Sequence, residues 1–395
     1  MSDIQLRRFQ PLHLKLEGVG PFRSAFEMPL TDKDGAPSNF FLLVSRNGFG
    51  KTTVLEVIHG LMKCLGAIRS TKYELPASFL LDELHSDLRR KPGKAQLDIR
   101  LELEGGGRAS AVVLSLYVGT DGPLRALTPS LIAEAQADIW IPAGLPPDRN
   151  SWNNGFRVDQ THQWVMDALR SSETTRVGDS LDRWFVPCGE FMALPTALYF
   201  TADRRILAPP PERRAVAHPE FSAYSAAHKF TTDGDTWETS LDGLLVWYEW
   251  LGGGLFEQAQ DLINSTLFSD SRKKLTAINR HTLAAVIEVE QEDGTKVSHG
   301  LDGLSHGERS LLHLLVRSAY HRTGSTILLL DEMETHLHPK WQYKLMALLK
   351  EWIRKWPDLT VIATTHQPAL IEEFAFERPE EGLVKGGYII EASEL

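Results

Sequence analysis

A short apolar run that leads through a glycine-rich turn into an amphipathic segment constrains this chain more than any other feature. Residues 39–44 (Asn-Phe-Phe-Leu-Leu-Val) are too few for a helix and are bounded by polar residues, as in a strand buried on both faces. From Thr52 onward, apolar residues recur at helical spacing as far as Leu65. The order strand, glycine-rich turn, helix is typical of α/β proteins that bind phosphate groups at the turn.

The turn runs Ser45-Arg46-Asn47-Gly48-Phe49-Gly50-Lys51-Thr52-Thr53. We expect the ATP-binding residues of this loop to be Asn47, Gly48, Gly50, Lys51, Thr52 and Thr53. Lys51 is spaced to reach the β- and γ-phosphates, and the Thr52 hydroxyl to bind Mg²⁺. Ser45 stands where the P-loop pattern has its first glycine. A plain surface turn is the alternative interpretation of Gly-Lys-Thr.

An apolar strand at residues 326–330 ends in two carboxylates, Asp331 and Glu332. Asp331 at the strand end suits a contact with Mg²⁺, direct or through water. Glu332 points elsewhere and suits polarisation of an attacking water molecule. The alternative is a strand that simply stops at a solvated acidic pair.

The segment Leu304-Ser305-His306-Gly307-Glu308 directly precedes an amphipathic stretch. Ser305 and Gly307 are placed to present hydroxyl and N–H donors to an anion at a helix start. Ser305 with Glu308 three residues later also fits a capping box. The two interpretations are compatible, because the same free N–H groups serve both purposes.

The fourth motif begins with a strand, at residues 360–363, that leads to His366. In an open α/β sheet, ligands gather at the carboxyl ends of the strands. Lys51, Asp331 and His366 all follow strand ends, so we expect them to lie at one edge of the sheet. A structural role is the alternative for a lone histidine at such a position.

Composition narrows the functional classes. Lys and Arg number 42 against 52 Asp and Glu, a net charge of −10, which argues against a surface devoted entirely to nucleic acid. Local basic clusters, among them Arg272-Lys273-Lys274, leave DNA open as a partner. The two cysteines have no ligand partner at metal-binding spacing. The chain opens without an apolar signal segment and has no apolar run of ~18 residues, so we expect a cytoplasmic protein without membrane contact.

Taken in order, the four motifs resemble the ABC-type ATPase head shared by RecF, SMC and OLD-family proteins. The segment Glu334-Thr335-His336-Leu337-His338-Pro339 looks most like the OLD and RecF-like ATPases of bacterial anti-phage systems such as Septu. Phe22-Arg23-Ser24 resembles the start of these heads and adds Arg23 to the expected ATP-binding residues. The resemblance covers about residues 10–120 and 284–395.

The resemblance implies an ATPase whose two heads form a homodimer, or a higher oligomer, with ATP between them. Thr52 and Asp331 would bind Mg²⁺, Glu332 would act as the catalytic base and His366 would sense the γ-phosphate. The signature residues Ser305, Gly307 and Glu308 would act on the nucleotide held by the partner subunit. A separate effector protein such as a nuclease would complete a DNA-directed defence or repair complex.

The expected fold is α/β: a P-loop NTPase of the ABC-ATPase head type, with a mixed sheet, an antiparallel layer and a mostly helical insertion. The expected division is residues 1–120 for the P-loop half, 121–283 for the insertion with a strand near 198–205 that returns to the head, and 284–395 for the second half. Met333 replaces the proline usual after the acidic pair, and no Q-loop glutamine is identifiable. There are two alternative functions. The first is the nucleotide-binding subunit of a transporter, and the second is a nucleotide-gated scaffold with negligible turnover.

Overall fold

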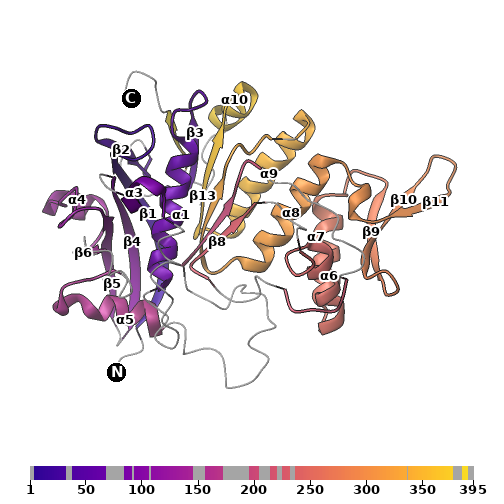
Figure 1. Ribbon diagram of the computed structural model, residues 1–395, viewed down its shortest axis with the longest axis horizontal. Coiled ribbons are helices and arrows are strands. Elements are labelled where there is room, and N and C mark those ends of the chain that lie inside the picture. The colour runs from indigo at the N-terminus through magenta and orange to yellow at the C-terminus, as the bar shows by residue number, and fades with distance from the viewer. Residues whose placement is uncertain are drawn as a thin grey trace.

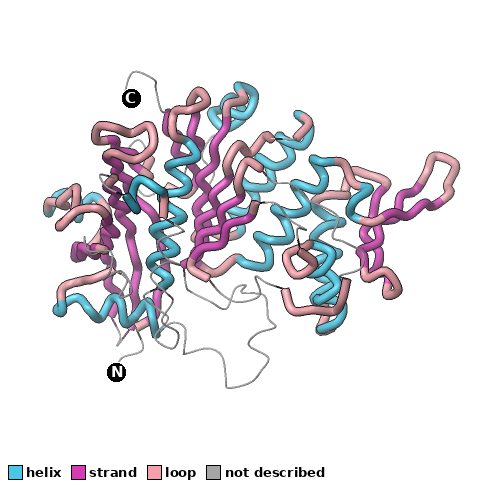
Figure 2. Tube along the Cα trace, viewed as in Figure 1, coloured by secondary structure: helices cyan, strands magenta, loops and turns pink. Residues whose placement is uncertain are grey.

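The computed structural model describes most of the chain in three sheets and the helices between them. The described residues are 4–32, 38–67, 84–90, 93–105, 108–145, 156–171, 195–203, 214–219, 225–231, 236–335, 337–376 and 385–389. Within them the sheets have six, five and three strands. Figure 2 shows the sheets ranged along the longest axis of the molecule, with the six-stranded sheet in the middle.

The six-stranded sheet is parallel throughout and has the order β14-β3-β13-β12-β7-β8. Its strands are β3 (Phe40–Val44), β7 (Pro195–Phe200), β8 (Ala227–Phe230), β12 (Ser325–Leu330), β13 (Leu359–Thr365) and β14 (Lys385–Ile389). Every residue of β7, β12 and β13 is buried, as expected for strands covered on both faces. The strands predicted after residues 39, 326 and 360 are confirmed.

Helices cover both faces of the parallel sheet (Figure 1). The longer helices are α1 (Lys51–Ala67), α5 (Gln163–Ser171), α6 (Leu241–Leu251), α7 (Leu255–Thr266), α8 (His306–His321), α9 (Pro339–Lys355) and α10 (Pro368–Phe376). One face, at β7 and β8, contacts α1, whereas α8, α9 and α10 contact β7, β13 and β3 from the other side. The helix predicted from Thr52 is therefore confirmed as α1, and the amphipathic stretch that follows residues 304–308 is α8.

The parallel sheet separates two hydrophobic cores. Successive side chains of a strand point to opposite faces, and β12 shows the result. Ile327 and Leu329 belong to the core that contains α1 and the five-stranded sheet. Leu328 and Leu330 belong to the core that contains α8 and α9. Each buried strand thus contributes to both cores, which explains why its sequence is continuously apolar.

The five-stranded sheet is the antiparallel layer that the sequence predicts. It has the order β2-β1-β4-β5-β6. Its strands are β1 (Gln5–Glu17), β2 (Phe26–Pro29), β4 (Lys94–Gly105), β5 (Arg108–Val118) and β6 (Ile139–Gly144). The pairs are antiparallel except β5 with β6. Two hairpins, β1 with β2 and β4 with β5, supply four of its strands, and the inner face of the sheet packs against α1.

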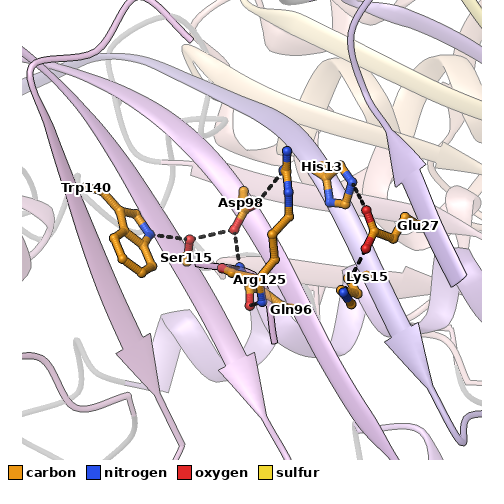
Figure 3. A network of polar contacts seen from close by, with 8 residues as sticks. All are labelled: His13, Lys15, Glu27, Gln96, Asp98, Ser115, Arg125 and Trp140. Carbon is orange, nitrogen blue, oxygen red and sulfur yellow. Dashed lines mark hydrogen bonds and ion pairs between the residues drawn. The ribbon is translucent and has the colours of Figure 1, made fainter. Parts of the chain in front are cut away.

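The outer face of this sheet carries a buried polar cluster around Asp98 (Figure 3). Asp98 accepts hydrogen bonds from Gln96 (2.7 Å) and Ser115 (2.5 Å), and Arg125 Nη1 lies 3.3 Å from its second oxygen. Ser115 also accepts a hydrogen bond from Trp140 Nε1. Burial raises the pKa of Asp98, although these donors act in the opposite direction. Because Arg125 lies in the connection from β5 to the short helix α4 (Pro129–Glu134), the cluster fastens that connection to the sheet.

The three-stranded sheet lies at the opposite end of the molecule (Figure 1). Its antiparallel strands are β9 (Lys273–Asn279), β10 (Ala284–Glu290) and β11 (Lys296–His299). The helices α6 and α7 contact β9 and β10. Gly252, Gly253 and Gly254 separate α6 from α7, with positive φ angles of 72°, 67° and 80°.

The segment 121–283 contributes to all three sheets. It supplies β6 to the five-stranded sheet, β7 and β8 to the parallel sheet, and β9 to the three-stranded sheet. The strand predicted near residue 198 is β7, paired with β12. Among the described helices of this segment, α4 precedes β6, α5 lies between β6 and β7, and α6 and α7 lie between β8 and β9.

Candidate functional site

The loops that carry the four motifs meet at one edge of the parallel sheet. All neighbouring strands of this sheet are parallel, so their carboxyl ends share an edge. Lys51 follows β3, Asp331 follows β12 and His366 follows β13, and these three strands are direct neighbours. The prediction that these residues lie at a common edge is therefore confirmed by the strand order.

The glycines of the loop after β3 differ in what surrounds them. Gly48 and Gly50 have φ angles of 85° and 88°, in the left-handed region that favours glycine. A Cβ atom on Gly50 would lie 2.5 Å from the ring of Phe22, whereas a Cβ on Gly48 would meet no atom within 4 Å. Phe22 lies in the connection between β1 and β2, so the five-stranded sheet fixes the course of the loop. Asn47 is exposed beside Gly48.

Lys51 is buried inside its own loop. Its Nζ donates to the carbonyl oxygen of Ser45 at 2.7 Å and to that of Arg46 at 3.2 Å. Ser45 therefore contributes through its backbone at the position where the P-loop pattern has glycine. The N-terminus of α1, with Thr52 and Thr53 in its first turn, opens directly behind the loop and offers free N–H groups to an anion.

Asp331 joins the P-loop to the neighbouring strands. Its Oδ2 accepts a hydrogen bond from Thr52 Oγ1 at 2.8 Å, and its Oδ1 accepts one from Thr364 Oγ1 at 2.8 Å. A hydroxyl and a carboxylate are oxygen ligands of the kind that Mg²⁺ prefers, and Mg²⁺ usually takes its other ligands from water and phosphate. No group of three or more His, Cys, Asp or Glu gathers as a metal site among the described residues. The donors present fit a magnesium ion shared with a nucleotide.

Glu332 is held in an unusual backbone conformation. Its φ angle is 43°, in the left-handed region, and its N–H donates to Thr364 Oγ1 at 2.7 Å. Its Oε2 accepts a hydrogen bond from Thr335 Oγ1 at 3.1 Å. Thr364 thus links the two acidic residues, a role that the sequence analysis missed. The signal was a polar residue at the end of an otherwise apolar strand.

His366 is paired with a second residue that the sequence analysis missed, Glu334. The two side chains approach at 2.8 Å between His366 Nδ1 and Glu334 Oε1. The same oxygen accepts the backbone N–H of His366 at 2.9 Å. Met333, at the position where proline is usual, is buried and its N–H donates to the carbonyl of Thr364.

The signature residues Ser305 and Glu308 form a capping box at the start of α8. Ser305 Oγ donates to Glu308 Oε2 at 2.8 Å, and Lys273 Nζ of β9 lies 2.7 and 2.8 Å from the two oxygens of Glu308. Burial raises the pKa of Glu308, but the hydrogen bonds from Lys273 and Ser305 outweigh it and the net pKa is lowered. Ser305 is exposed and Gly307 is buried. In the described part of the chain, the side-chain hydrogen bonds of Ser305 and Glu308 do not reach the P-loop.

The remaining predicted residues lie at the periphery. Arg23 is exposed next to Phe22, which contacts the P-loop glycine. Of the basic residues weighed as a DNA surface, Arg272 pairs with Glu292 and Lys273 with Glu308, while the Arg204-Arg205 pair lies outside the described residues. None of the helices in the described ranges combines the length and the apolar character needed to cross a bilayer.

Comparisons with known proteins give several matches to this chain. A family model described as "AAA domain, putative AbiEii toxin, Type IV TA system" matches residues 211–372, fewer than half of the chain. This match includes the signature, Asp331 and His366. The chain is thus similar to AAA-domain proteins over this range.

Relatives of this head include two bacterial proteins. It is similar to the Septu protein PtuA of Bacillus thuringiensis, with 41% identity over 49 residues, 12% of each chain. It is also similar to the retron Ec83 probable ATPase of Escherichia coli, with 32% identity over 87 residues, 19% of this chain and 16% of that one. The chain thus matches less than a fifth of the length of either relative. Among solved structures, the chain is similar to the SMC head domain from Thermotoga maritima. The match covers 92% of this chain and 91% of that one, with a TM-score of 0.34 and 13% sequence identity.

Proposed function

We propose that this head binds Mg-ATP at the P-loop and hydrolyses it. The observation that carries the proposal is the hydrogen-bonded chain from Thr52 through Asp331 and Thr364 to Glu332. It brings a hydroxyl and two carboxylates to the phosphate-binding loop at one edge of a parallel sheet. Oxygen ligands beside a carboxylate suit magnesium-assisted attack by water on a phosphate.

Each residue then has a defined task. Thr52 and Asp331 hold the Mg²⁺ ion, which offsets the negative charge of the β- and γ-phosphates. When ATP binds, Lys51 Nζ leaves the carbonyl oxygens of its own loop and donates to phosphate oxygens instead. The carboxylate of Glu332 gives up its hydrogen bond with Thr335, binds the attacking water molecule and accepts a proton from it. His366 contacts the γ-phosphate.

We propose that the complete site needs two copies of the head. Ser305 is exposed at the N-terminus of α8, a helix of 16 residues, and its side chain is ordered by Glu308. Free N–H groups at such a terminus bind anions. In the proposed homodimer, Ser305 and Gly307 of one subunit act on the γ-phosphate held by the other, and Arg23 contributes to nucleotide binding from the rim of the P-loop.

We propose a role in anti-phage defence, as an ATPase subunit that controls a separate effector such as a nuclease. The support is the similarity to a Septu protein and to a retron ATPase. In this proposal residues 1–120 and 284–395 carry the nucleotide-binding residues, and 121–283 completes the parallel sheet with β7 and β8. Contact with DNA would be made by the effector or by this segment.

The test compares the wild type with Glu332→Gln and with the control Glu351→Gln, which alters an exposed glutamate of α9. We expect the turnover of the wild type per head to rise with protein concentration, because two heads complete the site. Glu332→Gln should lose about a hundredfold or more in turnover, the usual contribution of a general base, and should accumulate as a dimer in Mg-ATP by native mass measurement.

Two outcomes would contradict the proposal. If the wild type and Glu332→Gln bind ATP and are equally inert, the head is a nucleotide-gated scaffold and not an enzyme. If the mass in Mg-ATP stays that of a monomer for both proteins, the proposal that two heads share the site is wrong. A co-purifying nuclease would support the defence role, whereas a co-purifying membrane protein would point to a transporter subunit.

A further inference from the structure

We propose that Glu334 is a positioning residue that holds the His366 ring through Nδ1, so that Nε2 is the nitrogen that meets the γ-phosphate. This inference rests on the proposed function, in which His366 contacts that phosphate. It adds a third acidic residue to the site, one that neither the P-loop pattern nor the acidic pair at the end of β12 identifies.

The first support is that one oxygen fixes two parts of His366. Glu334 Oε1 accepts the backbone N–H of His366 at 2.9 Å and lies 2.8 Å from its Nδ1. The ring is thereby tied at the same point as its own backbone, which restricts rotation about the side-chain bonds. A contact to Nδ1 leaves Nε2 as the free ring nitrogen, because an imidazole has only these two.

The second support is the difference in burial between the partners. The Glu334 side chain is 3% exposed and that of His366 is 44% exposed. The carboxylate therefore lies beneath the ring, and the ring faces outward, so the buried group can hold the exposed one in place. A charge buried to this degree is costly unless it is paired, so a purely structural role would be served better by an apolar side chain.

The third support is the second oxygen of Glu334. Oε2 is buried and accepts no hydrogen bond from the described residues. All the hydrogen bonding of this carboxylate in that part of the chain is thus directed at His366 through Oε1. Within the described residues, this buried carboxylate therefore acts on His366 and on no other residue.

The turn that carries Glu334 is itself fixed to β13. The N–H of Met333 donates to the carbonyl of Thr364, two residues before His366, and the N–H of Leu337 donates to the carbonyl of Glu334. The distance between the two loops is therefore set by backbone hydrogen bonds, independently of the ion pair. Glu334 is pre-organised to receive the ring.

The proton on Nε2 follows from the chemistry of phosphate. Phosphate oxygens accept hydrogen bonds, so Nε2 must carry a proton to bind them. With Nδ1–H already donated to Glu334, a proton on Nε2 makes the ring an imidazolium, and the adjacent carboxylate stabilises that positive charge. A neutral acceptor in place of Glu334 would accept Nδ1–H but would not stabilise the charge, as in other carboxylate–histidine pairs.

The first experiment locates the proton without any activity measurement. In protein labelled with ¹⁵N-histidine, the His366 signal is assigned by its loss in His366→Ala. We expect Nδ1 of the nucleotide-free wild type to be protonated. In Glu334→Ala the ring should shift toward the form with the proton on Nε2 alone. An unprotonated Nδ1 in the wild type would overturn the inference, whatever the protein does with ATP.

The second experiment measures kcat and KM for ATP in four proteins: Glu334→Gln, His366→Ala, the double variant and the control Glu351→Gln. We expect Glu334→Gln to lower kcat about tenfold to a hundredfold, the size seen when the outer partner of a functional histidine is removed. KM should change little, because the P-loop supplies most contacts to ATP. The double variant should be no slower than His366→Ala, since Glu334 acts through the ring.

The outcomes separate the inference from the function on which it rests. If His366→Ala loses activity and Glu334→Gln matches the wild type, the inference is wrong and the proposed function stands. If His366→Ala matches the wild type, the proposed contact with the γ-phosphate is wrong. Thermal unfolding of each variant shows whether a loss reflects misfolding, and in that case the ¹⁵N measurement on the wild type decides.

Discussion

Thr364 connects the two acidic residues of the candidate site at the scale of single atoms. Its hydroxyl accepts the N–H of Glu332 and donates to Asp331 Oδ1. A non-glycine residue with a φ of 43°, as at Glu332, costs about 1–3 kcal/mol and persists where its surroundings fix it. The hydroxyl of Thr364 is one of the groups that fix it.

Replacing Thr364 by Val tests this link. The two side chains have the same shape, so the change removes the hydroxyl and leaves the N–H of Glu332 and one oxygen of Asp331 without that partner. We expect a loss of about 1–3 kcal/mol in the free energy of unfolding, measured with urea. The control is Thr360→Val, which alters another buried threonine of the same strand. Equal losses in both variants would contradict the role of Thr364.

The two P-loop glycines give a second prediction at this scale. Gly48→Ala adds a methyl group in open space, so its cost is the backbone strain of a left-handed residue, about 1–2 kcal/mol. Gly50→Ala adds the same strain and also a clash with Phe22. We expect Gly50→Ala to be the less stable variant in urea and to lose ATP binding in calorimetry. Similar behaviour of the two variants would show that Phe22 moves aside freely.

At the scale of elements, a single ion pair joins the three-stranded sheet to the signature helix. Lys273 at the start of β9 contacts both oxygens of Glu308 in the first turn of α8. Glu308 in turn caps the helix through Ser305. The outlying sheet is therefore connected directly to the residues proposed to act across the dimer.

Lys273→Met should weaken this connection, since it keeps the length of the side chain and removes its charge. We expect a loss of about 1–3 kcal/mol in unfolding free energy, because a buried carboxylate loses its cation. The pKa of Glu308 should rise, because the lysine contributes the largest of the effects that lower it. The matched control is Lys296→Met, whose ion pair with Glu288 lies on the exposed hairpin. A larger loss at Lys296 would contradict the coupling.

At the scale of the whole molecule, the chain buries neutral histidines on both faces of the parallel sheet: His59 on α1, and His228 on β8 beside His321 of α8. Burial lowers the pKa of His59, on α1, to about 3, and nearby Lys63 and Lys229 act in the same direction. Burial also lowers the pKa of His228, on β8, to about 3. Both groups must lose contact with the interior before they can accept a proton.

This burial predicts sensitivity to acid. Each of these histidines has a lower pKa in the folded protein than in the unfolded chain, where it is near 6.5. Its contribution to stability is therefore complete above pH 6.5 and is lost as the pH falls from there toward 3. Between pH 7 and pH 5 we expect each histidine to remove about 2 kcal/mol from the free energy of unfolding. His59→Leu should reduce the pH dependence by that amount in urea titrations, and His281→Asn, at an exposed site, should leave it unchanged. An unaltered slope in His59→Leu would refute the assignment.

The sequence by itself determined four strands of the parallel sheet (β3, β7, β12 and β13), the phosphate-binding loop and the order of the motifs. A strand buried on both faces, a glycine-rich turn and a helix are each encoded within a few neighbouring residues, so local patterns reveal them. The antiparallel layer and the break between α6 and α7 followed for the same reason. The strands β6, β8, β9 and β14 escaped prediction because they are short or lack a clear alternation.

Only the tertiary structure decided which side chains meet. Thr52 and Asp331 are 279 positions apart, Asp331 and Thr364 are 33 apart, and Glu334 and His366 are 32 apart. A buried apolar strand has the same sequence pattern whichever strand lies beside it, so the order β3-β13-β12 could not be read from the residues. That order alone places the hydroxyl of Thr364 between the acidic residues and the carboxylate of Glu334 beneath the histidine ring.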